Sequence, residues 1–397
     1  MFDFLLNLNL GLIITVSVIG LFCLALSNRL WQSYENRLVN NNSTSEYIFA
    51  YALKAFTILY LISITTLALS IPLSMLSAWS SIQTLPLEIA TILTLGLLII
   101  GVSGLAALYV AFQKPNLTLK NYISVSPMTE PSLHKMIAEL AEHFRIEPID
   151  DIRITPGSEI EIKEPARTFD DVFSKRPKLI EIGLASMQLL SAGELKVIIA
   201  RQFAFYESDN HPPLDFIKKL NSRLELISNN ISRGGLLFML NPAAWIAAAM
   251  RPITSFITAD YLLMTEFRAD EIAAEYSGSK RLTGALARYN VETERYRELI
   301  DIATDFSRSG GGVLGSNIYD IMKRPRTEST DELKLMIDQL YTGTHLGRQD
   351  RGKRYLKLRL KRLPETADSP LDINLPATTW LTDWRATENR MMKLIKL

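Results

Sequence analysis

The chain has 397 residues, of which 48% are hydrophobic and 21% are charged, and its formal net charge is +1. This length is enough for about two or three domains, and the charged fraction is below the roughly 25% of soluble domains. The balanced charge gives no reason to expect nucleic-acid binding, and the single cysteine, Cys23, excludes a disulfide framework or a cysteine-based metal site within one chain.

Apolar stretches near the N-terminus predict three transmembrane helices, at about 10–27, 55–76 and 89–112. Each is close to the ~20 residues that a helix needs to cross a bilayer. The first stretch is not expected to be a secretion signal, because Asp3 precedes it and no Lys or Arg does. For any one of the stretches, the alternative is a buried helix of a soluble domain.

Basic residues around these stretches predict their orientation. They lie between the first two stretches and after the third, at Arg29, Arg37, Lys54, Lys114 and Lys120, whereas the connection 79–88 has none. The positive-inside rule then places the N-terminus outside and the main domain in the cytoplasm, in a multi-pass inner (cytoplasmic) membrane protein. We therefore expect a transmembrane region at 1–113, a cytoplasmic domain at 114–363 and a C-terminal tail at 364–397.

A further apolar region, 236–264, is harder to interpret. It contains the pairs Asn241-Pro242 and Arg251-Pro252 as well as Asp260, and prolines and charges disfavour a simple span. We expect an apolar hairpin, which either enters or faces the membrane or is buried in the globular domain.

The cytoplasmic part predicts a mainly α fold with a small β-sheet, in the α+β class. Apolar residues at helical spacing predict a helix over 129–145, and alternating patterns predict strands at 151–155, 159–163 and 178–182. Ser191 followed by Glu194 is close to a capping box, which predicts a helix from there to about 208.

The segment 183–200, GLASMQLLSAGELKVIIA, is similar to the lead-in of the helix on which zinc peptidases carry HExxH. Glu266, Ala269 and Asp270 match an E-x-x-A-D pattern, and 343–351, GTHLGRQDR, is similar to a later T-H-P element. In these motifs, over about 125–363, the chain resembles the membrane zinc-metallopeptidase family of the HtpX heat-shock protease and the CAAX prenyl protease. The resemblance implies a gluzincin-type peptidase domain, with Glu266 at the position of the third zinc ligand.

The chain departs from that family at the residues that carry the chemistry. Arg201 and Phe205 occupy the two His positions, and neither can coordinate a metal ion. Gln202 replaces the catalytic Glu, and an amide cannot act as a base. We therefore expect no zinc and no catalytic residues, although a metal site rebuilt from the chain's four His residues remains an alternative.

Two interactions are expected in place of the metal site. The Arg201 guanidinium can pair with Glu266, because a buried charge without a partner is costly; an ordinary surface carboxylate is the alternative reading of Glu266. The strand residues Glu159, Ile160, Glu161 and Ile162 form a possible edge for an extended peptide, or their charges protect the edge against aggregation.

A basic stretch at 348–362 fits anionic lipid or, alternatively, the solvated face of a helix. Together these features predict a membrane-anchored pseudo-peptidase that acts as a scaffold, adaptor or regulatory subunit through protein binding. Its expected partners are the lipid bilayer and a protein, such as a catalytically active relative or a larger membrane complex, and not nucleic acid. The alternatives are an active zinc metalloendopeptidase with non-standard ligands and a structural subunit of a membrane complex.

Overall fold

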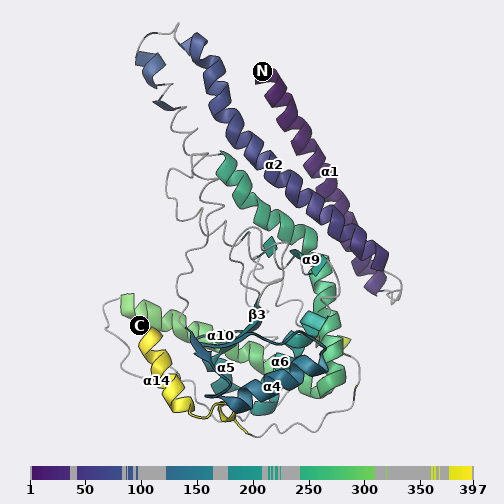
Figure 1. Cartoon of the computed structure of the whole chain (residues 1–397), viewed down its shortest axis with the longest axis vertical. Helices are drawn as coiled ribbons and strands as arrows, with labels where there is room; N and C mark the ends of the chain where they lie inside the picture. Colours follow the sequence, from purple (N-terminus) through teal and green to yellow (C-terminus); the bar gives the residue numbers. More distant parts are fainter. Residues whose placement is uncertain are drawn as a thin grey trace. The chain divides into compact units, whose positions relative to one another are not determined.

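The chain divides into two compact units, which the computed structural model describes in part (Figure 1). The first unit comprises residues 1–116, 166–175 and 210–264, and the second comprises 117–165, 176–209 and 265–397. The structure describes residues 2–35, 43–82, 86, 88–92, 95–96, 122–163, 178–207, 213–214, 216–217, 220–221, 224, 242–308, 319, 359–360, 362–363, 366 and 375–395.

The first unit is built on two long helices that pack along each other, α1 (Phe2–Glu35) and α2 (Ser43–Ile82). Cys23, Leu53 and Phe56 are buried between the helices of this unit. Gly20 allows the close approach, because a Cβ there would lie 3.1 Å from the Phe56 ring. The apolar contact between these helices therefore depends on a small residue opposite a large one.

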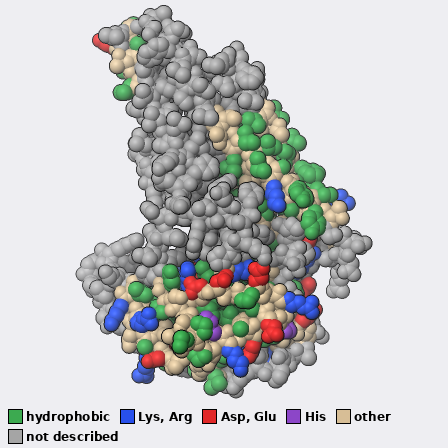
Figure 2. Space-filling view, viewed as in Figure 1, with side chains coloured by type: hydrophobic (Ala, Val, Ile, Leu, Met, Phe, Trp, Pro, Cys, Tyr) green, Lys and Arg blue, Asp and Glu red, His purple; other side chains and the backbone are tan. Residues whose placement is uncertain are grey.

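Two of the described helices are long and apolar enough to cross a membrane, by length and composition, over Gly11–Ser33 and Thr44–Ser63. These segments overlap the first two predicted spans, whereas the third, 89–112, lies largely outside the described residues. Large apolar side chains such as Leu21 point outward from α1, where Figure 2 shows hydrophobic groups gathered. The hydroxyls of Thr15 and Ser17 donate to carbonyls of their own helix at 2.8 Å, which suits a surface without water.

From residue 242 onward, the region expected to form a hairpin is one continuous helix, α9 (Pro242–Ser277). Pro252 lies inside it and removes one backbone hydrogen bond without ending the helix. In the first unit, the Tyr261 N–H donates to Ser27 Oγ (3.2 Å), and the Tyr261 ring lies 5.3 Å from that of Phe49. This part of α9 is therefore buried against helices rather than folded back on itself; residues 236–241 lie outside the described residues.

The second unit contains a four-stranded mixed sheet in the order β1-β2-β4-β3. The strands are β1 (Ile123–Val125), β2 (Asp151–Thr155), β3 (Ile160–Lys163) and β4 (Leu179–Gly183), and only the β2–β4 pair is parallel. One face presents almost only isoleucine to the core, from positions 123, 152, 154, 160, 162, 180 and 182. This alternation confirms the three predicted strands, whereas β1 was not predicted.

Helices cover the apolar face of the sheet in the second unit. They include α4 (Pro131–His143), α5 (Leu184–Leu189), α6 (Ala192–Glu207) and α10 (Ser279–Arg308). The predicted capping box at the start of α6 is confirmed, because Glu194 N–H donates to Ser191 Oγ (3.1 Å) and Ser191 N–H donates to Glu194 Oε2 (2.8 Å). The described fold is therefore mostly helical with a small mixed sheet, as the α+β prediction required.

Residues 375–395, within the segment expected as a C-terminal tail, pack into the second unit. They form η4 (Ala377–Trp380) and α14 (Trp384–Ile395). Ala377 N–H donates to Leu190 O (3.0 Å), and Ala192 N–H donates to Leu375 O (2.7 Å). The C-terminal residues thus hold the turn from which α6 begins.

Candidate functional site

Four charged side chains meet in the second unit, at the place where the sequence predicts a lost metal site. Arg201 projects from α6, and Glu266 and Asp270 project from α9 one helical turn apart. Arg201 Nη2 forms an ion pair with Glu266 Oε2, and Arg201 Nε donates to Asp270 Oδ1 at 2.8 Å. The structure therefore brings Arg201 and Glu266 together and adds Asp270 to the pair.

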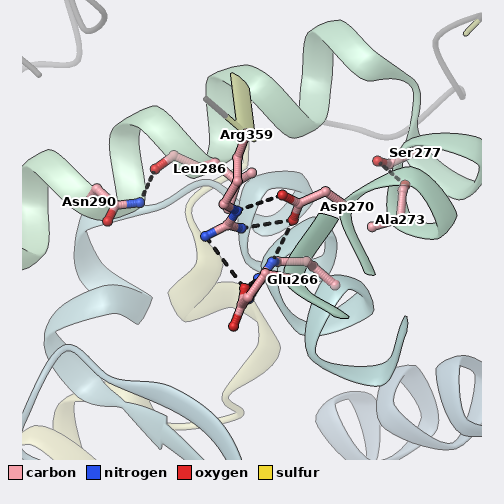
Figure 3. A network of polar contacts seen from close by, with 8 residues as sticks. Glu266, Asp270, Ala273, Ser277, Leu286, Asn290 and Arg359 are labelled. Carbon is pink, nitrogen blue, oxygen red and sulfur yellow. Dashed lines mark hydrogen bonds and ion pairs between the residues drawn. The ribbon is translucent and has the colours of Figure 1, made fainter. Parts of the chain in front are cut away.

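A second guanidinium, from Arg359, completes this cluster of Arg201, Glu266, Asp270 and Arg359. Figure 3 shows Arg359 facing Glu266 and Asp270. Arg359 donates from Nε to Asp270 Oδ2 at 2.6 Å and from Nη2 to Asp270 Oδ1 at 2.8 Å, which is a two-pronged contact. Its Nη1 lies 3.5 Å from Glu266 Oε2. Two positive and two negative groups therefore face one another, and their charges cancel.

The cluster is buried on the Asp270 side and partly open on the Glu266 side. The Asp270 and Arg201 side chains are 2% and 9% exposed, whereas Glu266 is 33% exposed. Burial opposes ionisation of Asp270, but the charges of Arg359 and then Arg201 outweigh it and hold the pKa of Asp270 below its usual value. Burial, and then the neighbouring Arg359, lower the pKa of Arg201 to about 10, so this group remains protonated at neutral pH.

Residues near Arg359 in the chain contact the second half of α9 and the start of α10. The Arg362 guanidinium lies 5.2 Å from the centre of the Phe267 ring, within cation–π distance. Farther along, the Thr366 N–H donates to Ser279 Oγ (3.0 Å), and Thr366 Oγ1 donates to Ala274 O (2.9 Å). Arg359, Arg362 and Thr366 thus link this part of the chain to α9 and α10, and Arg359 contributes its charge to the cluster.

The other two residues that the sequence resemblance places at HExxH positions, Gln202 and Phe205, lie on the same helix. Phe205, one turn after Arg201, is partly buried and packs against the core, and Gln202 is also partly buried. Ala269 is fully buried in α9 beside Asp270. These residues do not fit a zinc ion, because neither the guanidinium nor the phenyl ring offers a donor atom to a metal.

No group of three or more His, Cys, Asp or Glu side chains that could hold a metal ion is found among the residues that the structure describes. Of the four His residues, His134 and His143 are described: the His134 ring contacts Val125 O at 2.9 Å, and the His143 ring packs on Phe144 and Tyr276. His211 and His345 lie outside the described residues, as does the basic stretch up to residue 358.

The proposed peptide-edge strand is β3, which lies at one end of the described sheet. Ile160 and Ile162 point into the core, whereas Glu161 is exposed on the opposite face with its carboxylate 3.2 Å from Lys163 Nζ. Lys163 also donates to Glu181 Oε2 at 2.7 Å, across the β3–β4 pair. Glu159 is exposed just before the strand. The charges on this face thus pair within the sheet.

Arg359 was not predicted as a member of the site. It lies 89 residues after Asp270 in the chain, within the basic stretch that suggested lipid or solvent. The only local signal is its position among alternating leucines, which gives no indication of a carboxylate partner. Asp270 was singled out as part of the E-x-x-A-D pattern, but its role as the acceptor of hydrogen bonds from both arginines was not predicted.

Comparisons with known proteins give no relative for this chain. No family model, no curated protein and no solved structure matches it.

Proposed function

We propose that this chain is a membrane-anchored pseudo-peptidase, a degenerate relative of the zinc-metallopeptidase family with HtpX-like members, which acts as a scaffold, adaptor or regulatory subunit. It binds protein rather than cleaving it. The cytoplasmic side of the inner membrane is the proposed location of the second unit, as the distribution of Lys and Arg predicts.

The observation that carries the proposal is the contact of Arg201 with Glu266 and Asp270. A zinc peptidase of this type holds its metal between ligands from an HExxH helix and a carboxylate from a second helix. Here the guanidinium of the first helix meets the carboxylates of the second. A fixed organic cation thus takes the electrostatic role of the metal, but it offers no site for a water molecule to be activated as a nucleophile.

Membrane anchoring rests on the two apolar helices of the first unit. Their outward-facing apolar side chains and their internally bonded hydroxyls match the requirements of a lipid environment. A contiguous apolar surface of this kind is uncommon on a soluble monomer.

The proposal is tested on the full chain purified in detergent. Elemental analysis is expected to find no stoichiometric zinc, and unfolded casein is expected to remain intact during incubation. The contrary result is about one zinc per chain that is lost in Glu266→Gln but retained in Glu275→Gln, an exposed position on the same helix. That result would favour an active metallopeptidase with non-standard ligands.

A separate experiment distinguishes a binding subunit from a protein that acts alone. The chain is isolated under mild conditions from native membranes after chemical cross-linking, and a defined protein partner is expected in fixed proportion. Isolation without a partner in repeated preparations would contradict the scaffold and adaptor roles.

A further inference from the structure

The outer edge of β3 is defined by the register of the sheet. Gly183 N–H donates to Glu159 O at 2.8 Å, so residues 159 and 183 are a hydrogen-bonded antiparallel pair. Because such pairs alternate along a ladder, residues 161 and 163 also bond toward β4. The backbone N–H and C=O groups of Ile160 and Ile162 therefore point away from β4, where a further strand would add.

Two tyrosine side chains bond to these outward-pointing groups. Ile160 N–H donates to the hydroxyl oxygen of Tyr289 from α10 at 3.1 Å. The hydroxyl of Tyr206, at the end of α6, donates to Ile162 O at 2.7 Å. Tyr206 is 7% exposed. Burial raises the pKa of Tyr289 above its usual value, so the Tyr289 hydroxyl remains protonated at neutral pH.

We infer that Tyr206 and Tyr289 close the β3 edge of the described sheet to an added strand. An antiparallel strand would need both groups of Ile160 or both groups of Ile162, and one of each pair is bonded to a tyrosine. A parallel strand could use Ile160 O and Ile162 N–H, but its next bond in either direction would meet a tyrosine. A longer ladder along Ile160–Ile162 would have to displace the Tyr289 hydroxyl from Ile160 N–H or share the Ile162 carbonyl with the Tyr206 hydroxyl.

This inference deepens the proposed function and rests on one part of it, namely that the second unit binds protein. If β3 is closed, the protein partner binds a surface other than the β3 edge. It also explains how an edge of alternating apolar residues avoids pairing with other chains, a common hazard of exposed edges.

The experiment uses the full chain in detergent and a synthetic heptapeptide of alternating threonine and valine with a lysine at each end. Its lysines match the exposed Glu159 and Glu161 beside the edge. The double variant Tyr206→Phe with Tyr289→Phe removes both hydroxyls and keeps the rings. The matched control is Tyr296→Phe with Tyr319→Phe, because those two hydroxyls donate to Pro156 O, which is not on the β3 edge.

Binding is measured by fluorescence anisotropy of the labelled peptide, and exchange of the Ile160 amide is measured by hydrogen–deuterium exchange mass spectrometry. The double variant is expected to bind the peptide about tenfold more tightly than the wild-type chain and the control, and its 158–163 segment should exchange faster. Equal binding by all three proteins, or equal exchange in the double variant and the wild type, would overturn the inference. Neither outcome bears on zinc content, so failure here is separable from failure of the pseudo-peptidase proposal.

Discussion

Replacing Asp270 by asparagine should destabilise the second unit by about 3–5 kcal/mol, because it leaves buried guanidinium groups without their main counter-charge. Asp270 accepts three hydrogen bonds of 2.6–2.8 Å from Arg201 and Arg359, and its side chain is 2% exposed. Bonds of this kind contribute about 1.5–3 kcal/mol each, but they share one acceptor group and do not add independently. The asparagine amide would in addition turn N–H groups toward a guanidinium.

The matched change is Glu266→Gln on the same helix. The Glu266 side chain is 33% exposed, so water screens its interaction with Arg201 and Arg359. We expect a cost of about 1 kcal/mol or less for this variant. The comparison separates a buried charge from a partly solvated one within a single cluster.

Thermal unfolding of the full chain in detergent, followed by near-ultraviolet circular dichroism, measures the difference. Asp270→Asn should lower Tm by roughly 10 °C, and Glu266→Gln by only a few degrees. The double variant Arg201→Met with Asp270→Leu should cost less than the sum of its single changes, which is the signature of coupling. Equal Tm values for Asp270→Asn and Glu266→Gln would refute the reasoning that burial decides the strength of each pair.

Three further outcomes are expected. Gly183→Ala should prevent stable folding, because a Cβ at residue 183 would overlap the carbonyl of Gly157. Gly157→Ala should be tolerated, because a Cβ at residue 157 meets no atom closer than 3.8 Å. Circular dichroism of both variants checks this. The lowered pKa of Asp270 means that its stabilising contribution is complete above the unfolded pKa of about 3.9 and is lost as pH falls below it; Tm in acid should fall more steeply for the wild type than for Asp270→Asn. A cytoplasm-dependent reporter fused after Leu397 should be active, and activity of a periplasm-dependent reporter there would contradict the proposed orientation.

The sequence predicted those helices and strands whose pattern is contained in a few neighbouring residues. Alternating isoleucines predicted β2, β3 and β4, and the Ser191–Glu194 pair predicted the start of α6, because the alternation and the cap are local properties. The three-residue β1 has too few residues to show a period. Pro252 suggested a break in a helix that in fact continues, because packing in the first unit outweighs one lost hydrogen bond.

Of the candidate site, only the residues that align with the family motifs could be predicted from the sequence. The pairing of Arg201 with Glu266 was predicted from the resemblance, which places both residues at positions that would ligate one metal ion. Arg359 reaches Asp270 across 89 residues of sequence, and no local pattern specifies such a contact. The C-terminal packing of Ala377 on Leu190 is equally distant in sequence. Both are tertiary contacts that become visible only when the chain is folded.

We propose that the Arg201 guanidinium stands where a zinc peptidase of the resembling family would hold its metal ion. The zinc content of a variant that restores the motif tests this proposal, with Arg201→His, Gln202→Glu and Phe205→His, together with Arg359→Gln to remove the opposing charge. We expect about one zinc per chain in this variant, with Glu266 as the third ligand, and none in the wild type. A folded variant that binds no zinc, with Tm close to that of the wild type, would contradict the claim.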